Sequence, residues 1–542
     1  MPTLFFLSAP PTEKTAAMAG FTPDSVAQWL HNAPTANQAQ FCIELCRRVG
    51  EINRAGFGGR DLLHLAETLR PSVLSVQSYL LARVAGKAYP LDQDDQAAGE
   101  VLLNLGREYG QMYSVLLQEI EAAMDSAAER PLGLLIHRLI RCVSLLLLVY
   151  YSLHLKVPAW LWRDMHAIYR LAMQKRKTDE RQRDAAAVHQ TVSLSVKEVY
   201  VQALLLGMAD PYRLQGSEIL ALYQQLETLA PMVRLSPLSG KTSAEEWLVQ
   251  LDKDTPPIRQ AAGSVANGLL IDCKTLDQHL AGQIERIRVR SGRFEPSAAI
   301  ESTGGLSYDL LRHLRRCWRC RAEEGAEFVA VEGGICITSG FRATHALLSP
   351  ARASAPAVET AAPSGGLLLK TTHSALTSRP ENWEATLLGE GQYCCDGDIP
   401  GRLVLGALLS YRPLSYVRAA ESESAEPPVV EQGLAVVDRV FMDRLGGVVK
   451  FSLRKLTGKV LPAGLQPAKL DPKNPNIYQR ALVYVDDRAA PVRSYLILES
   501  LRQQEGSVVR LLTDHGMTFV KLAGRENIAL GCSRFACVAA VD

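Results

Sequence analysis

The sequence predicts a multidomain α+β protein with an all-α helical N-terminal half, a β-barrel after it and an additional C-terminal β segment. Through residues 21–290, apolar residues recur at the spacing of helices that pack on helices. From residue 327 onward, short alternating runs are separated by glycine, proline and aspartate, a pattern typical of a barrel or a sandwich. The chain has 542 residues, which is enough for several domains.

Changes in composition divide the chain further. Two stretches rich in alanine, serine and proline are expected to be flexible insertions in the barrel, and Met18 is an alternative start that follows a loose tail. The last segment either forms a second small barrel or extends the first. The expected divisions are a flexible tail at 1–20, a helical domain at 21–290, an arginine-rich linker or helix at 291–326, a barrel at 327–458 with insertions at 349–380 and 419–430, and a β extension at 459–542.

The helical half contains one very apolar run, residues 142–151. It is far shorter than the about 20 residues that a membrane span needs. Arg138 and Arg141 precede it on the same helical pattern, so we expect a buried core helix and no transmembrane segment. Upstream, Pro71 marks a kink or a break in the helical pattern of residues 61–86.

Overall charge and cysteine content narrow the class of protein. The formal net charge is only +2, so no global field attracts a nucleic acid polymer or an anionic membrane, and any anion site must be local. The 11 cysteines are odd in number and several lie among apolar residues, as reduced cysteines do. With no basic region before a long apolar run at the N-terminus, these features predict a cytoplasmic protein.

Catalytic motifs are not found in the sequence. The stretch SGKTS (239–243) resembles the end of a P-loop, but the required first glycine would fall on Leu235. The sequence contains no G-x-S-x-G motif and no H-E-x-x-H motif, and no G-x-G-x-x-G motif opens a βαβ unit. We therefore expect no enzyme, nominate no catalytic residue and expect no cofactor.

The most distinctive segment is RHLRRCWRCR (312–321), which contains a C-x-x-C pair, Cys317 and Cys320. A structural zinc site needs four ligands, and no second C-x-x-C pair exists, because Cys394 and Cys395 are adjacent. Neighbouring arginines lower thiol pKa values, so a metal or redox role stays as a minor alternative. We expect ordinary reduced cysteines and no metal.

The same segment holds five arginines at positions 312, 315, 316, 319 and 321. The pairs Arg312/Arg316 and Arg315/Arg319 have i, i+4 spacing, so on a helix two guanidinium groups can converge on one anion. Arginine binds phosphate with two hydrogen bonds and matches the O6/N7 edge of guanine. The alternative is a solvated basic face that is balanced by nearby glutamates.

An arginine segment directly before an all-β domain resembles the layout of PilZ domains. More closely, the chain resembles long, mainly proteobacterial PilZ-like proteins with a large helical N-terminal region, over most of residues 21–458. The stretches that carry this resemblance are LRPSVLSVQSYLLARVAGKAYPLDQDDQ (69–96), VPAWLWRDMHAIYRLA (157–172), ADPYRLQGSEILALYQQLETLAPMVRL (209–235), VQLDKDTPPIR (249–259) and GFRATHALLS (340–349). The resemblance implies a six-stranded barrel that binds cyclic di-GMP together with the arginines.

This chain departs from the second motif of that family, [D/N]-x-S-x-x-G, in the stretch WEATLLGEGQYCC (383–395). Alignment on the tryptophan places Gly389 and Gly391 at the Asp/Asn and Ser positions, with Tyr393 near the motif's glycine. Each missing hydrogen-bonding partner costs on the order of 1–3 kcal/mol. The resemblance therefore implies a degenerate site that consists of the arginines and the barrel residues Gly389, Gly391 and Tyr393.

Taken together, these features predict a non-enzymatic bacterial signalling protein. Arg315 and Arg319 are the first choices for binding nucleotide, followed by Arg312, Arg316 and Arg321. The possible ligand is cyclic di-GMP, and the helical domain is expected to bind a protein partner. The alternative function is a ligand-independent helical scaffold.

Overall fold

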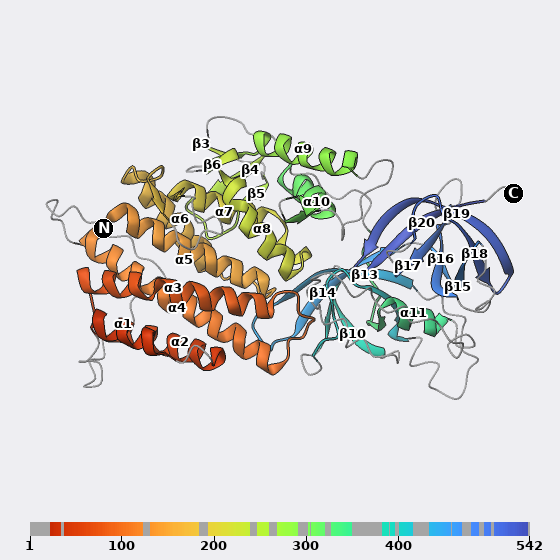
Figure 1. Ribbon diagram of the computed structural model, residues 1–542, viewed down its shortest axis with the longest axis horizontal. Coiled ribbons are helices and arrows are strands. Elements are labelled where there is room, and N and C mark those ends of the chain that lie inside the picture. Colours follow the sequence, from red (N-terminus) through yellow and green to blue (C-terminus); the bar gives the residue numbers. More distant parts are fainter. Residues whose placement is uncertain are drawn as a thin grey trace.

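The computed structural model describes most of the chain. The described residues are 22–33, 37–122, 131–183, 193–238, 246–259, 268–290, 302–303, 305–319, 327–348, 382–389, 391–395, 400–415, 433–456, 458–468, 478–486, 493–499 and 503–539. The predicted tail at 1–20 and the predicted insertions at 349–380 and 419–430 lie outside these residues. Helices fill the N-terminal half and two β-barrels follow, so the predicted fold class is confirmed (Figure 1).

Eight helices build the body of the N-terminal half. They are α1 (Pro23–Asn32), α2 (Gln38–Arg54), α3 (Gly59–Val84), α4 (Gln93–Ala122), α5 (Leu132–Ser152), α6 (Ala159–Gln174), α7 (Val196–Met208) and α8 (Gly216–Leu229). Helix α3 continues through Pro71, so that residue does not break it. Short strands β1 (Arg181–Arg183) and β2 (Ser193–Ser195) pair before α7.

Helix α5 is the core of this half, as the apolar run predicted. Among the described residues, α5 is the one helix that is long and apolar enough to cross a membrane. However, 83% of its most apolar 18-residue stretch is buried inside the protein. Its two arginines form ion pairs inside the protein: Arg141 pairs with Glu227 at 3.0 Å, and Arg138 pairs with Glu67 at 3.0 Å. Helix packing around α5 therefore buries both apolar and paired polar groups.

A small antiparallel sheet interrupts the helices. Its strands are β3 (Arg234–Pro237), β4 (Trp247–Gln250), β5 (Ile258–Arg259) and β6 (Gly268–Asp272), in the order β3-β6-β4-β5. Helices α9 (Lys274–Arg290) and α10 (Tyr308–Trp318) follow it, and the hairpin of β7 (Ser302–Thr303) and β8 (Leu306–Ser307) leads into α10. The N-terminal half is thus mainly, but not wholly, helical.

The first barrel consists of six antiparallel strands that close on themselves. They are β9 (Ile335–Ser339), β10 (Asn382–Gly389), β11 (Gln392–Cys395), β12 (Leu408–Pro413), β13 (Gly433–Met442) and β14 (Val449–Leu456), in the order β10-β11-β14-β13-β12-β9. Helix α11 (Phe341–Leu348) follows β9. The barrel interior belongs to the same apolar core as the helical half.

The C-terminal segment forms a second closed barrel rather than extending the first. Its strands are β15 (Lys459–Pro467), β16 (Gln479–Asp486), β17 (Arg493–Leu498), β18 (Val508–Thr513), β19 (Gly516–Ala529) and β20 (Cys532–Ala539), in the order β15-β16-β17-β20-β19-β18. Counted from its first strand, each barrel has the order first-second-third-sixth-fifth-fourth. The two barrels therefore share one strand topology.

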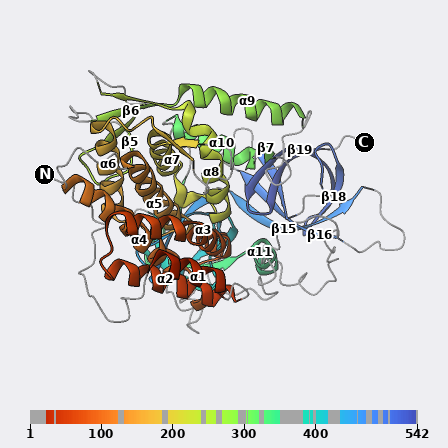
Figure 2. The same ribbon diagram turned by 60° about the vertical axis from the view of Figure 1, so that its left-hand side comes forward.

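The first barrel lies between the helical half and the second barrel (Figures 1 and 2). On the helical side, backbone bridges join Tyr89 to Leu403 and Leu155 to Met442. On the other side, outward-facing apolar residues of both barrels form one cluster, and His345 of α11 lies 3.0 Å from the carbonyl oxygen of Ala463 in β15. The first barrel is thus the central module of the chain.

Candidate functional site

The arginine segment folds as helix α10 on the surface of the helical half. Ser307 caps the helix by accepting a hydrogen bond from the backbone N–H of Leu310 at 3.2 Å. Leu311, Leu314 and Trp318 are buried, and the Trp318 indole N–H donates to the carbonyl oxygen of Leu205 at 3.0 Å. This apolar face anchors the helix, and the arginines lie on its more exposed sides.

Arg315 and Arg319 converge on one anion, as their spacing predicted, but the anion is a carboxylate of this chain. Arg315 donates to Asp277 of α9 through Nε at 2.7 Å and through Nη2 at 3.4 Å. The Arg319 Nε lies 3.6 Å from the same carboxylate. Asp277 is therefore the carboxylate that the two guanidinium groups share.

The other arginines of the segment have different contacts. The Arg312 guanidinium lies over the Tyr308 ring, 5.7 Å from its centroid. Arg316 donates to Nδ1 of His313 at 3.1 Å, while Nε2 of that histidine donates to the carbonyl oxygen of Ala209 at 2.8 Å. Burial, followed by the charge of Arg316, lowers the pKa of His313, so the imidazole is neutral near pH 7. Arg321 lies outside the described residues.

The expected barrel side of the site is the turn between β10 and β11. Gly389 and Gly391 have φ values of +129° and +74°, which disfavour aspartate and serine there. A Cβ on Gly391 would stand 3.2 Å from the Val329 carbonyl oxygen. The backbone conformation of this turn therefore disfavours the side chains that the family's second motif carries at these two positions.

Tyr393 points into the barrel. Its ring is fully buried and stacks on Phe451 with the centroids 5.9 Å apart, and its hydroxyl accepts a hydrogen bond from the backbone N–H of Val331 at 2.9 Å. The side chain is thus a core element that fixes the segment entering the barrel. The arginines of α10 contact Asp277, Tyr308 and His313, whereas Tyr393 contacts Phe451 and Val331.

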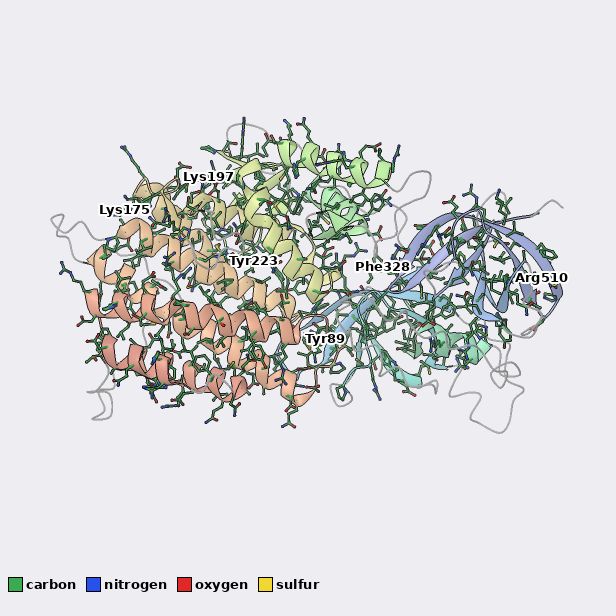
Figure 3. The ribbon with its side chains drawn as sticks, viewed as in Figure 1. Tyr89, Lys175, Lys197, Tyr223, Phe328 and Arg510 are labelled. Carbon is green, nitrogen blue, oxygen red and sulfur yellow. The ribbon has the colours of Figure 1, made fainter. Side chains whose placement is uncertain are left out.

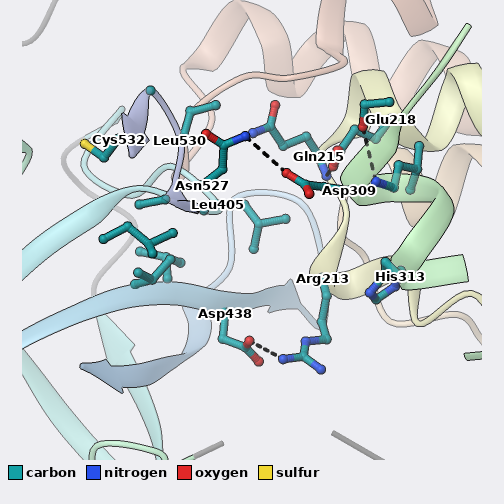
Figure 4. Close-up of a pocket in the computed structure, with 18 of the residues that line it drawn as sticks. Arg213, Gln215, Glu218, Asp309, His313, Leu405, Asp438, Asn527, Leu530 and Cys532 are labelled. Carbon is teal, nitrogen blue, oxygen red and sulfur yellow. Dashed lines mark hydrogen bonds and ion pairs between the residues drawn. The ribbon is translucent and has the colours of Figure 1, made fainter. Parts of the chain in front are cut away.

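A cavity of about 650 Å³ lies where α10, the first barrel and the second barrel meet (Figure 4). We call it the junction cavity and define it by six of its lining residues: Arg213, Asp309, Arg316, Asp438, Arg454 and Asn527. They come from the segment before α8, from α10, from β13 and β14, and from β19. Of the predicted site residues that the structure describes, Arg316 alone lines this cavity.

One side of the junction cavity is rich in guanidinium groups. Arg213 forms a short ion pair with Asp438 of β13, and Arg454 lies 3.9 Å from the same carboxylate. Next to the cavity, Arg439 pairs with Asp210 at 2.5 Å. These pairs connect the helical half to the outer face of the first barrel.

The opposite side presents carboxylate and amide groups. Asp309 of α10 accepts a hydrogen bond from Asn527 of β19 at 3.4 Å, and Figure 4 shows this pair across from Arg213 and Asp438. Nearby Glu218 accepts from the backbone N–H of Gln215 at 2.9 Å. Burial, followed by the negative charge of Asp309, raises the pKa of Glu218, and the hydrogen bond from Gln215 offsets part of this.

Sequence reasoning missed Arg213, Asp438, Arg439 and Arg454, which belong to the turn 209–214 and to two barrel strands. No local pattern could have grouped them, because Arg213 and Asp438 are 225 residues apart. Only the antiparallel pairing of β13 with β14 places Val436 beside Arg454 on the outer face of the barrel. A search for arginines on outward-facing strand positions would have found Arg454 as one of several candidates.

The cysteine alternative gains no geometric support. Burial raises the pKa of Cys317 to about 11, which disfavours the reactive thiolate, and its Sγ lies 3.4 Å from Nε2 of His313. Cys320 lies outside the described residues. Among the residues that the structure describes, no group of three or more His, Cys, Asp or Glu side chains is placed to hold a metal ion.

The helical half, the arginine-bearing helix and the closed six-stranded barrel together resemble the layout of PilZ-domain-like proteins with a large helical N-terminal region. Comparison with known proteins supports this resemblance. Residues 24–240 match the family model of the N-terminal domain of the cyclic-di-GMP receptor FimW. The resemblance drawn from the sequence is confirmed by this match.

A curated relative is the cyclic-di-GMP receptor FimW of Pseudomonas aeruginosa, which is 26% identical over 352 residues. The aligned region is 63% of this chain and 56% of the relative, so the chain spans just over half of the relative's length. No solved structure matches the chain.

Proposed function

We propose that this chain is a non-enzymatic, cytoplasmic regulatory protein that binds cyclic di-GMP with weakened affinity and acts through protein partners of its helical half. The observation that carries the proposal is the arginine helix α10 directly before a six-stranded barrel, in a chain whose residues 24–240 match a receptor's N-terminal domain. The relative's ligand supports the choice of cyclic di-GMP.

Weak binding follows from two features of the site. The turn at Gly389 and Gly391 offers no side-chain hydrogen bonds. In addition, a ligand phosphate must displace Asp277 to engage both Arg315 and Arg319. Ion pairs with partly exposed arginines are screened by salt, so affinity should fall as ionic strength rises.

Calorimetric titration of the full chain with cyclic di-GMP at low and at physiological salt tests this function. We expect micromolar or weaker affinity that falls with salt, and a further loss in the Arg315→Ala/Arg319→Ala double variant. Submicromolar affinity that is insensitive to salt would contradict the degenerate site. Absence of heat at low salt would overturn the receptor function and leave the ligand-independent scaffold.

A further inference from the structure

The second barrel carries an apolar surface on the side that points away from the first barrel. We propose that two copies of the chain pair through this surface about a two-fold axis. We call it the outer barrel face, and it consists of outward-facing residues of β18, β19 and β20: Val508, Arg510, Met517, Phe519, Lys521 and Val538. The pairing does not depend on a nucleotide.

The outer barrel face is free because the second barrel uses other strands to pack on the first. The apolar cluster between the barrels includes Leu482 of β16, Ile497 of β17 and Cys532 at the start of β20. Strand β18 lies on the far side of the second barrel (Figure 1), and Figure 3 shows Arg510 at this outer end of the molecule.

Strand register gathers exposed apolar side chains on this face. Lys521 of β19 pairs with Val508 on one side and with Val538 on the other, and Met517 lies four residues before it on the same side of the strand. Val508, Val538 and Met517 are 41%, 51% and 52% exposed. Single exposed apolar side chains are common in monomers, but a continuous group of them indicates an interaction site.

Arg510 is an independent sign of a missing partner on the face. Its guanidinium lies over the Phe519 ring, 5.2 Å from the centroid, and among the described residues its Nε atom is buried without a hydrogen-bond partner. Buried N–H groups normally donate a hydrogen bond, so this one needs an explanation. A carboxylate supplied by a second molecule would provide both an acceptor and the opposite charge.

Charge divides the face into a basic and an acidic end. Arg510 and Lys521 are its two cations, and the exposed Asp514 lies in the turn between β18 and β19 at the other end. The remaining charged side chains of residues 503–539 lie beyond Lys521, toward the turn between β19 and β20, and their charges cancel: Glu505, Arg525, Glu526 and Arg534.

A second copy of the chain complements this pattern. A two-fold axis that crosses the strands between Phe519 and Met517 turns the face end for end, so Phe519 of each copy meets Met517 of the partner subunit. Contacts between sulfur and aromatic rings are favourable. The same rotation brings Asp514 of each copy toward the two cations of the other, so each favourable contact forms twice.

This use of both ends favours a second copy over an anionic lipid surface. A lipid surface would attract Arg510 and Lys521 but would bring Asp514 against like charge. In the two-fold pair all three charged groups face an opposite charge. Because the helical half lies at the other end of the chain (Figure 1), such a dimer links two helical halves and raises the avidity for a partner with several binding sites.

Sedimentation velocity of the full chain over a range of concentrations measures the pairing, and the Met517→Lys variant tests the face. We expect a reversible dimer that is about tenfold or more weaker in this variant, because the new lysine must lose its hydration in an apolar contact. Val448→Lys is the matched control, since Val448 is 46% exposed in the turn before β14 of the first barrel. Circular dichroism verifies that each variant is folded.

A charge exchange tests the two-fold arrangement. Asp514→Lys and Lys521→Glu each place like charges together at both ends of the interface, so either variant alone should dimerise about tenfold or more weakly. A mixture of the two variants should pair more tightly than either alone, because opposite charges then meet at both ends. Arg493→Glu on β17 is the control, since Arg493 is exposed outside the face.

The outcomes decide both the face and its occupant. A dimer that Met517→Lys weakens and the mixture restores supports the interface. A wild-type chain that stays monomeric overturns it, as does a dimer that Met517→Lys leaves intact or a mixture that pairs no better than its components. A monomeric chain that binds vesicles of phosphatidylcholine with phosphatidylglycerol, and loses this binding in Lys521→Glu, would replace the second copy by a lipid surface. None of these results changes the cyclic di-GMP titration, so the two proposals fail separately.

Discussion

The two barrels have the same strand order but different relations to the rest of the chain. The interior of the first barrel contains four large aromatic side chains, Trp383, Tyr393, Tyr411 and Phe451, and is continuous with the core of the helical half. The core of the second barrel is separate, and Phe535 is its one aromatic residue among those described. The same strand topology therefore forms the central module of the chain in the first barrel and a separately packed module in the second barrel.

This difference shows that closure of a barrel does not determine how the barrel is connected to the rest of the chain. Both barrels satisfy their strand edges by closing. What distinguishes the first is the set of backbone bridges and ion pairs that join it to the helices, as at Leu155/Met442 and Arg213/Asp438. The second barrel contacts it mainly through an outer apolar cluster.

The largest expected effect comes from removing a buried ring in each barrel. Phe451→Ala and Phe535→Ala should each cost about 3–5 kcal/mol in the barrel that contains the ring. Because only the first core continues into the helices, Phe451→Ala should also lower the denaturant midpoint of the helical circular dichroism signal. Phe535→Ala should leave that midpoint nearly unchanged.

Phe519→Ala is the control for this comparison, since Phe519 is only partly buried on β19 and stacks with Arg510 at 5.2 Å. It should cost much less than Phe535→Ala. Equal shifts of the helical midpoint by Phe451→Ala and Phe535→Ala would show that the two barrels unfold together with the helices.

Acid should weaken the helical half before the second barrel. Burial lowers the pKa of His154 and His166 to about 4, and in each ring one nitrogen contacts a tyrosine hydroxyl while the other contacts a carbonyl oxygen. In the unfolded chain these groups titrate near 6.5, so the unfolded state binds more protons below that pH. Stability is complete above about pH 6.5 and falls toward pH 4, by roughly 3 kcal/mol for each histidine.

Denaturant titrations between pH 7 and pH 4 measure this loss. The helical signal should lose stability over that range, whereas the second barrel has only one histidine, the exposed His515. The variant His64→Gln is a control, because His64 is exposed and should not change the slope. A helical midpoint that stays constant from pH 7 to pH 4 would contradict the prediction.

The smallest effect is expected at the surface pair between the barrels. Arg342 of α11 lies 2.9 Å from Glu499, but their side chains are 59% and 43% exposed. Arg342→Ala should cost less than about 1 kcal/mol, because solvent and salt screen such pairs. A loss above 2 kcal/mol in chemical denaturation would show that this ion pair, and not the apolar cluster, holds the barrels together.

Much of the fold could be predicted from the sequence because it depends on local pattern. The apolar run at residues 142–151 predicted a buried helix, and the alternation after residue 327 predicted barrel strands. The sequence could not decide between a second barrel and an extension of the first, since strand partners far apart in the chain determine closure. The pairing of β15 with β18 makes that decision.

For the site, the sequence by itself predicted that an arginine-rich linker or helix precedes a barrel, and that two of its arginines, if helical, can share an anion. Only the tertiary structure decided that Asp277 is that anion, and that Arg316 lies with Arg213 and Arg454 at a separate cavity. The physical reason is that spacing along a helix fixes which side chains are neighbours on its surface. The identity of the groups facing them depends on segments that folding brings together from distant parts of the chain.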